Sequence, residues 1–183
     1  MVHLPSGRPV HSYSCWRIIM GQILTNVRDF KVSAHPAVTT TQKFWKDCCG
    51  VAWMNEDFKA QFVGLEVTAT DSAVLSISKL ERYSFDDAIL KELGVKPETS
   101  VHHFAELLRR NKNSSEVSIV YLRGLDEKRW AVDTRWNELR NGWDVYARPM
   151  KKAMREWHAG RVVVSRLHTG KKLFRFLSSS IYT

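Results

Sequence analysis

The C-terminal stretch Ala147–Thr183, ARPMKKAMREWHAGRVVVSRLHTGKKLFRFLSSSIYT, decides the predicted fold because it contains one helical pattern followed by two strand patterns. Pro149 suits the first turn of a helix, and Gly160 suits its end. Between them, four apolar residues have the spacing of one helix face: Met150, Ala153, Met154 and Trp157. The first part of the stretch therefore predicts a helix with an inward apolar stripe.

Two runs rich in β-branched and aromatic residues follow this helix, Arg161–Leu167 and Lys172–Leu177. A short segment around Thr169 and Gly170 separates them and has the composition of a turn. The sequence therefore predicts a β-hairpin near the end of the chain.

The same stretch holds almost all of the net charge. Residues 147–183 contain nine Lys and Arg against one acid, Glu156, and the whole chain has a formal net charge of +9. A solvated surface is the simplest explanation of a charge run, but this segregation favours an anionic partner, either a phosphate backbone or a lipid headgroup. The predicted anion-binding residues are Arg148, Lys151, Lys152, Arg155, Arg161, Arg166, Lys171, Lys172 and Arg175.

Length and composition predict one globular domain. The chain has 183 residues, 44% of them hydrophobic, which is enough for a single core. Residues 1–11 contain two prolines and a glycine and are expected to be an extended arm before a domain over residues 12–183. We expect no membrane-spanning segment and no secretory signal. Three cysteines, Cys15, Cys48 and Cys49, form no disulfide or zinc pattern and suit a reducing compartment.

The remaining periodicity predicts a single compact α+β domain, an antiparallel sheet packed with several helices. The clearest signal is the apolar alternation within Gln61–Leu80, which predicts an antiparallel strand pair turning at Asp71 and Ser72. The other expected elements are a strand over 12–32, a helix over 36–49, connecting chain over 51–59, a helix over 85–93 with a capping box at Ser84, a central strand over 116–123, and a short strand and helix around 134–140. A further helix is expected from a cap at Thr99 or Ser100 through the apolar residues Phe104, Leu107 and Leu108. Its C-terminal end is basic, with Arg109, Arg110 and Lys112.

Common enzyme signatures are absent, including the glycine-rich phosphate cradle, Gly-x-Ser-x-Gly, His-Glu-x-x-His and Cys-x-x-Cys. His102 and His103 are adjacent on a predicted helix, so they point in different directions and cannot bind one metal from the same face. Trp130, Trp136 and Trp143 are expected in the core, with base stacking as the alternative. We therefore predict a protein that is not an enzyme and has no cofactor and no metal.

The order of these elements resembles the globular domain of rhabdovirus matrix proteins, especially the short basic ones of plant cytorhabdoviruses and dichorhaviruses. The resemblance lies in the strand over 16–27, the helix with Phe44 and Trp45, the apolar strand over 62–70, and the closing helix and hairpin. It implies a viral structural protein that self-associates, condenses the nucleoprotein-RNA complex and links it to the inner face of the envelope.

The resemblance also implies partners and a location. In that family an N-terminal arm of one subunit docks on the next, and the anchors here would be Leu4 and Val10. The expected location is the virion beneath the envelope, with the host cytoplasm, the membrane surface and the nucleus as further sites. The chain lacks a Pro-Pro-x-Tyr motif and a Lys-rich N-terminal tail, which shifts membrane or nucleocapsid contact onto the basic C-terminal residues. The alternatives are a sequence-independent RNA-binding viral protein, such as a silencing suppressor, and an enzyme such as a nuclease.

Overall fold

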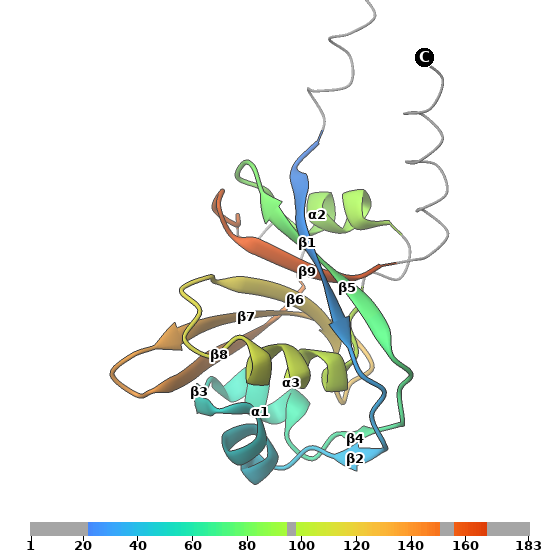
Figure 1. Cartoon of the computed structure of the whole chain (residues 1–183), viewed down its shortest axis with the longest axis vertical. Helices are drawn as coiled ribbons and strands as arrows, with labels where there is room; N and C mark the ends of the chain where they lie inside the picture. Colours follow the sequence, from blue (N-terminus) through green and yellow to red (C-terminus); the bar gives the residue numbers. More distant parts are fainter. Residues whose placement is uncertain (1–21, 95–97, 151–155, 168–183) are drawn as a thin grey trace, which may run out of the picture.

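The structure, a computed structural model, describes residues 22–94, 98–150 and 156–167. Their main feature is a mixed seven-stranded sheet with the order β1-β5-β9-β6-β7-β8-β3 (Figure 1). Its strands are β1 Leu24–Val32, β3 Val51–Met54, β5 Ala73–Leu80, β6 Ser118–Arg123, β7 Arg129–Asn137, β8 Gly142–Pro149 and β9 Val162–Arg166. The pairs β3-β8 and β6-β9 are parallel and the others are antiparallel. The predicted α+β fold of one compact domain is confirmed.

Both faces of the sheet carry apolar side chains, because successive residues of a strand point to opposite sides. On β6, Val120 and Leu122 belong to a core that includes Phe58 and Phe104, from the helices α1 (Glu56–Phe62) and α3 (Val101–Arg110). Ile119 and Tyr121 belong to a second core with Ile89 of α2 (Asp86–Leu93). Figure 1 shows α1 and α3 in front of the sheet.

Smaller elements complete this front layer. The π-helix η1 (Phe44–Cys48) buries Trp45 in the first core, and Gly50, at φ +71°, ends the helical turns as predicted. A separate two-stranded sheet pairs β2 (Val38–Thr39) with β4 (Glu66–Val67). No helix of the described residues is long and apolar enough to cross a membrane.

The C-terminal stretch differs from its prediction. Residues 162–166 do form a strand, but β9 lies between β5 and β6, so over Val162–Val164 both of its edges are already paired. It is therefore a central strand, not one arm of a hairpin, and its predicted partner over 172–177 lies outside the described residues. Pro149 ends β8, and Trp157 forms a bridge with Ser84, so the predicted helix is wrong at both described ends.

Local periodicity also gave wrong elements in the first half of the chain. The helix expected from residue 36 starts only at Gln42, after β2, and the connecting chain expected over 51–59 contains β3 and the start of α1. The strand pair expected within 61–80 does not form, because β4 pairs with β2 while β5 pairs with β1 and β9. Alternation identified β5 as a strand, but it does not specify the partner of a strand.

Elements with strong end signals were predicted better. Helix α3 starts after Ser100, whose Oγ accepts the His103 N–H at 3.2 Å, and β6 is central as expected. Helix α2 ends at Gly94, but its N-cap is Phe85, so the capping box at Ser84 is wrong. The short helix around 134–140 is also wrong, because β7 continues to Asn137 and turns into β8. Of the long first strand, residues 12–21 lie outside the described residues.

Candidate anion-binding face

The structure places three of the nine predicted anion-binding residues. Arg148, at the end of β8, and Arg161, just before β9, both approach the Asp133 carboxylate of β7, at 2.8 and 3.9 Å. Arg166 lies on the opposite face, because its cross-strand partner Leu75 packs in the core beneath α3. The other predicted residues lie outside the described residues: Lys151, Lys152, Arg155, Lys171, Lys172, Arg175, and the arm residues Leu4 and Val10.

The ring of Trp157 lies against the same two arginines. The guanidinium carbons of Arg148 and Arg161 lie 5.0 and 5.4 Å from the centroid of its ring. The ring is buried, and its indole N–H donates to Asp86 Oδ1 at 2.7 Å. One buried carboxylate and one buried ring therefore fix two guanidinium groups near the surface, an arrangement that combines charge with cation-π attraction.

A second set of the same kind lies on the same face. The Asp144 carboxylate of β8, which is fully buried, accepts hydrogen bonds from Arg140 at 2.9 Å and Asn137 at 2.9 Å, with Arg135 at 3.7 Å. Arg135 and Arg140 are about half exposed. Since side chains two residues apart on a strand share a face, Asp144 of β8 faces the same side as Arg148, and both sets share one surface.

A third carboxylate, that of Glu98, also holds two arginines, Arg123 and Arg129. Burial raises the pKa of Glu98, but the hydrogen bond from Arg129 and the nearby positive charges outweigh this and bring the pKa below its ordinary value. This set lies at the far end of β7, beyond Ala131, which packs in the core with α2. It is therefore separate from the other two.

Aromatic side chains accompany the second set. The ring centroids of Trp53 and Tyr146 are 4.8 Å apart, Arg140 lies 6.0 Å from the Trp53 ring, and Arg135 donates to the Tyr146 hydroxyl at 3.2 Å. We call the combined surface the arginine-aromatic face. Its residues are Trp53, Arg135, Arg140, Tyr146, Arg148, Trp157 and Arg161.

Sequence reasoning missed five of these residues: Trp53, Arg135, Arg140, Tyr146 and Trp157, the last of which was predicted only as a core residue of a helix. The available signal was the alternation of Asp144, Tyr146 and Arg148, which becomes visible only when residues 142–149 are recognised as a strand. The tryptophans considered as stacking platforms instead lie in or against the core: Trp130 and Trp143 are buried and Trp136 packs beside them.

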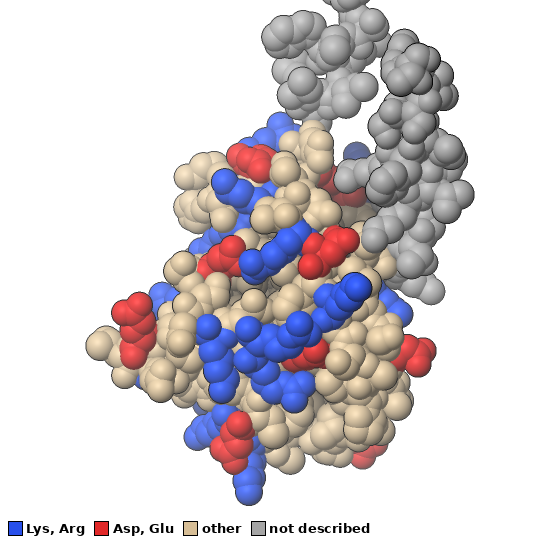
Figure 2. Space-filling model, viewed as in Figure 1, with Lys and Arg blue, Asp and Glu red and all other residues tan. Residues whose placement is uncertain are grey.

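A different group of cations lies on the opposite side of the sheet. Figure 2 shows Lys and Arg crossing the face over α3 and β1. This basic band consists of Arg28, Arg109, Arg110 and Lys112, all exposed. Arg28 pairs with Glu116 and Arg110 with Glu106, whereas Arg109 and Lys112 form no ion pair with any described residue. Arg109 and Arg110 lie in the last turn of α3, where the helix dipole favours cations.

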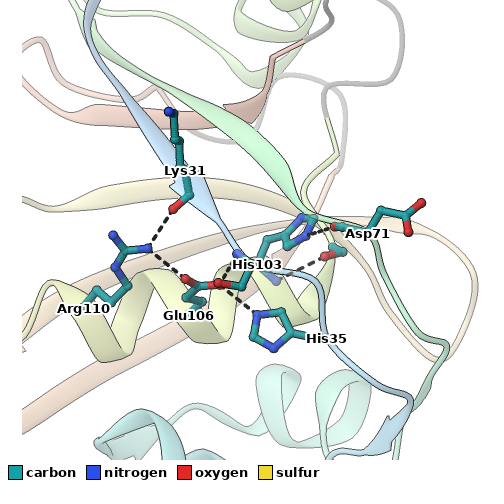
Figure 3. Close-up of polar contacts among 8 residues, drawn as sticks. Lys31, His35, Asp71, His103, Glu106 and Arg110 are labelled. Atoms are coloured by element: carbon teal, nitrogen blue, oxygen red, sulfur yellow. Dashed lines mark hydrogen bonds and ion pairs between the residues drawn. The ribbon is translucent and has the colours of Figure 1, made fainter.

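Beneath the basic band, the buried Glu106 side chain joins α3 to the end of β1 (Figure 3). One carboxylate oxygen accepts the Ser33 N–H and the His35 Nε2–H, both at 2.8 Å. The other accepts from Arg110, which also donates to the Lys31 carbonyl. Burial raises the pKa of Glu106, but these hydrogen bonds outweigh it and bring the pKa below its ordinary value.

The two adjacent histidines are buried on α3 beside the same junction. His102 stacks on His35 with ring centroids 5.4 Å apart, and the His103 Nε2–H donates to the Asp71 carbonyl at 3.0 Å (Figure 3). Burial lowers the pKa of both rings. Among the described residues, no group of three or more His, Cys, Asp or Glu side chains could hold a metal ion.

A cavity between β1 and α3, lined in part by Arg28, Leu107 and Glu116, has a volume of only about 10 Å³. That is room for one water molecule at most, whereas small-molecule sites occupy some hundreds of Å³.

No protein-family model, curated protein sequence or solved structure matches this chain. The resemblance to rhabdovirus matrix proteins thus rests on the order of elements alone. Three of those elements differ in the structure. The only strand within residues 62–70 is the short β4, and residues 162–166 form a central strand. The described ends of the predicted closing helix, Pro149 and Trp157, are not helical. The fold and its surface define an α+β domain with an arginine-rich sheet face, and the matrix assignment stays a prediction.

Proposed function

We propose that this chain is a non-enzymatic, nucleic-acid-binding structural protein that holds the phosphate backbone of RNA on its arginine-aromatic face. The observation that supports this proposal is the repeated use of one carboxylate for two arginines. Asp144 with Arg135 and Arg140 has a formal charge of +1, and both arginines are about half exposed. This set can therefore offer a positive charge to a phosphate group.

Arginine is suited to this task because its planar guanidinium group donates two parallel hydrogen bonds to a phosphate and stacks on aromatic rings. Here the carboxylates and rings already fix the arginine side chains, so less conformational entropy is lost when a phosphate binds. The two carboxylates lie in neighbouring strands of one sheet, so a single polymer chain can contact both sets. Because phosphate groups are the same in every nucleotide, arginine contacts to phosphates should give binding without sequence preference.

The distribution of charge supports different roles in RNA binding for two parts of the chain. Nine of the 28 Lys and Arg and none of the 19 Asp and Glu lie outside the described residues, so the described residues hold 19 of each and are neutral. Attraction of RNA from a distance then comes from the basic segments at residues 151–155 and 168–183, while the arginine-aromatic face positions the bound chain.

The test is the affinity of the full chain for two unrelated fluorescent RNAs as the salt concentration is raised from about 50 to 200 mM. We expect equal affinities and a log-log salt slope near −0.7 for each phosphate contacted. A slope that corresponds to two or more phosphate contacts supports the proposal. Absent binding, or binding that ignores salt, would overturn it.

A second candidate function is adsorption to an anionic membrane, and the basic band favours it. Arg109 and Lys112 are free of ion pairs with described residues, and each cation near an anionic leaflet contributes about 1 kcal/mol. Sedimentation with phosphatidylcholine vesicles, with and without phosphatidylserine, tests this function. Binding that requires phosphatidylserine and weakens in Arg109→Gln/Lys112→Gln supports it, and binding to neither vesicle rejects it.

Together, these two activities would suit the matrix-type role proposed from the resemblance. One sheet face would contact the nucleoprotein-RNA complex and the opposite face the inner envelope surface, which places the protein in the virion and at host membranes. Self-association belongs to the same proposal. Sedimentation equilibrium at rising protein concentration tests it, and a monomer at all concentrations would contradict it.

A further inference from the structure

Trp53 and Tyr146 are aromatic residues that the folding of this chain does not account for. Both are half-buried on the open sheet face, and neither belongs to the two buried core clusters or packs against them. Their rings contact each other at 4.8 Å with a 48° tilt. Aromatic side chains usually stabilise a fold by core burial, so a contacting pair outside the core requires another explanation.

Hydrogen bonding and packing together distinguish Trp53 from the other described tryptophans. Four indole N–H groups donate to acceptors in the body: those of Trp45, Trp130, Trp143 and Trp157. The indole N–H groups of Trp53 and Trp136 have no acceptor among the described residues, but Trp136 packs against the core and Trp53 does not. The Trp53 nitrogen is not among the buried atoms that lack a partner, so it keeps contact with solvent.

The backbone brings these two rings together. Trp53 lies on the edge strand β3, which pairs in parallel with β8 so that Trp53 is opposite Asp144, next to Tyr146. This close approach requires Gly142, because a Cβ there would lie 2.7 Å from the Ala52 Cβ and 2.8 Å from the Gly50 carbonyl. The position of Trp53 is thus fixed by the sheet and not by a flexible loop.

Two arginines flank the rings. Arg140 lies 6.0 Å from the Trp53 ring and Arg135 lies 5.7 Å from the Tyr146 ring. We infer that Trp53 and Tyr146 form a stacking platform for an unpaired nucleobase, whose neighbouring phosphates contact Arg135 and Arg140. This inference rests on the proposed function and adds to it a preference for single strands.

The preference follows from what each form of nucleic acid exposes. A duplex keeps the faces of its bases inside its own stack, whereas a single strand presents them to aromatic side chains. Stacking of one base on an aromatic ring strengthens binding by a factor of about 10, and it tolerates any base because every base has a π-face. The platform therefore discriminates between strand states without reading sequence.

Three probes of equal length test the inference: oligothymidylate, the matching duplex, and an abasic deoxyribose-phosphate chain. The abasic chain offers the same phosphates without bases. We expect the full chain to bind oligothymidylate about 10-fold more tightly than the abasic chain. In Trp53→Leu the affinities for oligothymidylate and the abasic chain should become about equal, while the salt dependence of binding stays the same. The matched control Trp53→Phe should keep most of the difference in affinity.

A second pair of variants, Tyr146→Leu with Tyr146→Phe as its control, repeats the test if Trp53→Leu fails to fold. Equal affinity of the wild type for oligothymidylate and the abasic chain would overturn the stacking inference and leave phosphate binding intact. Retention of the wild-type ratio in the folded leucine variants would also overturn it. Binding to none of the three probes would instead reject the proposed function itself.

Discussion

The two cationic surfaces of this molecule hold their charges in different ways. On the arginine-aromatic face, each guanidinium group lies against a buried carboxylate and an aromatic ring. On the basic band, Arg109 and Lys112 have no ion pair with described residues, and they lie at the end of α3. The arginines of the first surface are therefore fixed and these two cations are free, and fixed charges bind a phosphate at a lower entropic cost.

The buried carboxylates beneath the two surfaces also differ. Asp144 accepts hydrogen bonds from the side chains of Asn137 and Arg140, with Arg135 nearby. Glu106 accepts the backbone N–H of Ser33 as well as bonds from His35 and Arg110, so it connects two elements of the fold. We infer that Asp144 mainly positions the arginines of the surface above it, whereas Glu106 mainly stabilises the domain.

The largest expected effect breaks the Glu106 junction. Glu106→Ala leaves the Ser33 N–H and the His35 ring without their acceptor in a buried site, which should lower the free energy of unfolding by about 3 kcal/mol. Urea unfolding followed by circular dichroism measures this change. Asp144→Asn, which keeps the shape of the side chain, should cost about 1 kcal/mol in the same measurement. Equal losses in the two variants would contradict the distinction between them.

The second prediction compares the two surfaces directly. Arg135→Gln/Arg161→Gln removes one arginine from each set, while Arg140 and Arg148 still neutralise the buried carboxylates. We expect RNA affinity to fall about 30-fold, because two charge-assisted hydrogen bonds are lost.

The matched control for this double variant is Arg109→Gln/Lys112→Gln, which removes the same charge from the basic band. Its RNA affinity should fall only about threefold, as expected for long-range attraction alone. Fluorescence anisotropy with one labelled RNA measures both variants. An equal loss in the two would mean that net charge, and not the arginine-aromatic face, sets the affinity.

The third prediction concerns acid. Burial lowers the pKa of His102 and His103. Below the ordinary histidine pKa of about 6.5, these two rings are therefore protonated in the unfolded chain while they are still neutral in the folded chain. The contribution of these rings to the free energy of unfolding should therefore be constant above that pH and fall below it, by at most about 1.4 kcal/mol per pH unit for each ring. The neighbouring side chains with ionisable groups are His35, Glu106 and Arg166.

Urea unfolding at a series of pH values measures this slope. His102→Gln should reduce the slope of the free energy of unfolding against pH, because one titrating ring is removed. Glu106 has a lowered pKa, so its stabilisation is lost only at more acidic pH, below about 4.5. A free energy of unfolding that stays level from pH 7 down to about 5 would contradict the buried, neutral state of the histidines.

The smallest expected effect separates charge from geometry. Arg135→Lys keeps the positive charge but loses the planar group that lies over Tyr146 and donates to its hydroxyl. RNA affinity should fall about threefold with an unchanged salt slope. A control on the basic band, Arg109→Lys, should have no effect, because Arg109 has no ion pair there. A reduced salt slope in Arg135→Lys would show that the fold, and not only the geometry, had changed.

The sequence predicted best those elements whose signals are local. Helix α3 has its cap at Ser100, its apolar stripe and its basic end within one short segment, and all were recognised. Strand pairing depends on residues far apart in the chain. The run Val162–Val164 suits a hairpin arm as well as a central strand, and only its pairing with Ile77 and Val120 decides between them.

Local sequence patterns were also insufficient to predict the site. Charge segregation pointed to Arg148 and Arg161, which do lie together, but it also grouped them with Arg166, on the opposite face. Arg135 and Trp53 join the surface only through the register of β7, β8 and β3, which local periodicity does not contain. A shift of one residue in any of these strands would turn the side chains to the other face.

The most direct test of RNA binding by the arginine-aromatic face is photo-crosslinking of the full chain to RNA that contains 4-thiouridine, with the crosslinked peptides identified by mass spectrometry. We predict crosslinks in the peptides that contain Trp53 and Tyr146, from β3 and β8. These crosslinks should disappear in Arg135→Gln/Arg161→Gln. Crosslinks confined to peptides outside residues 51–54 and 142–149 would contradict the assignment of this face.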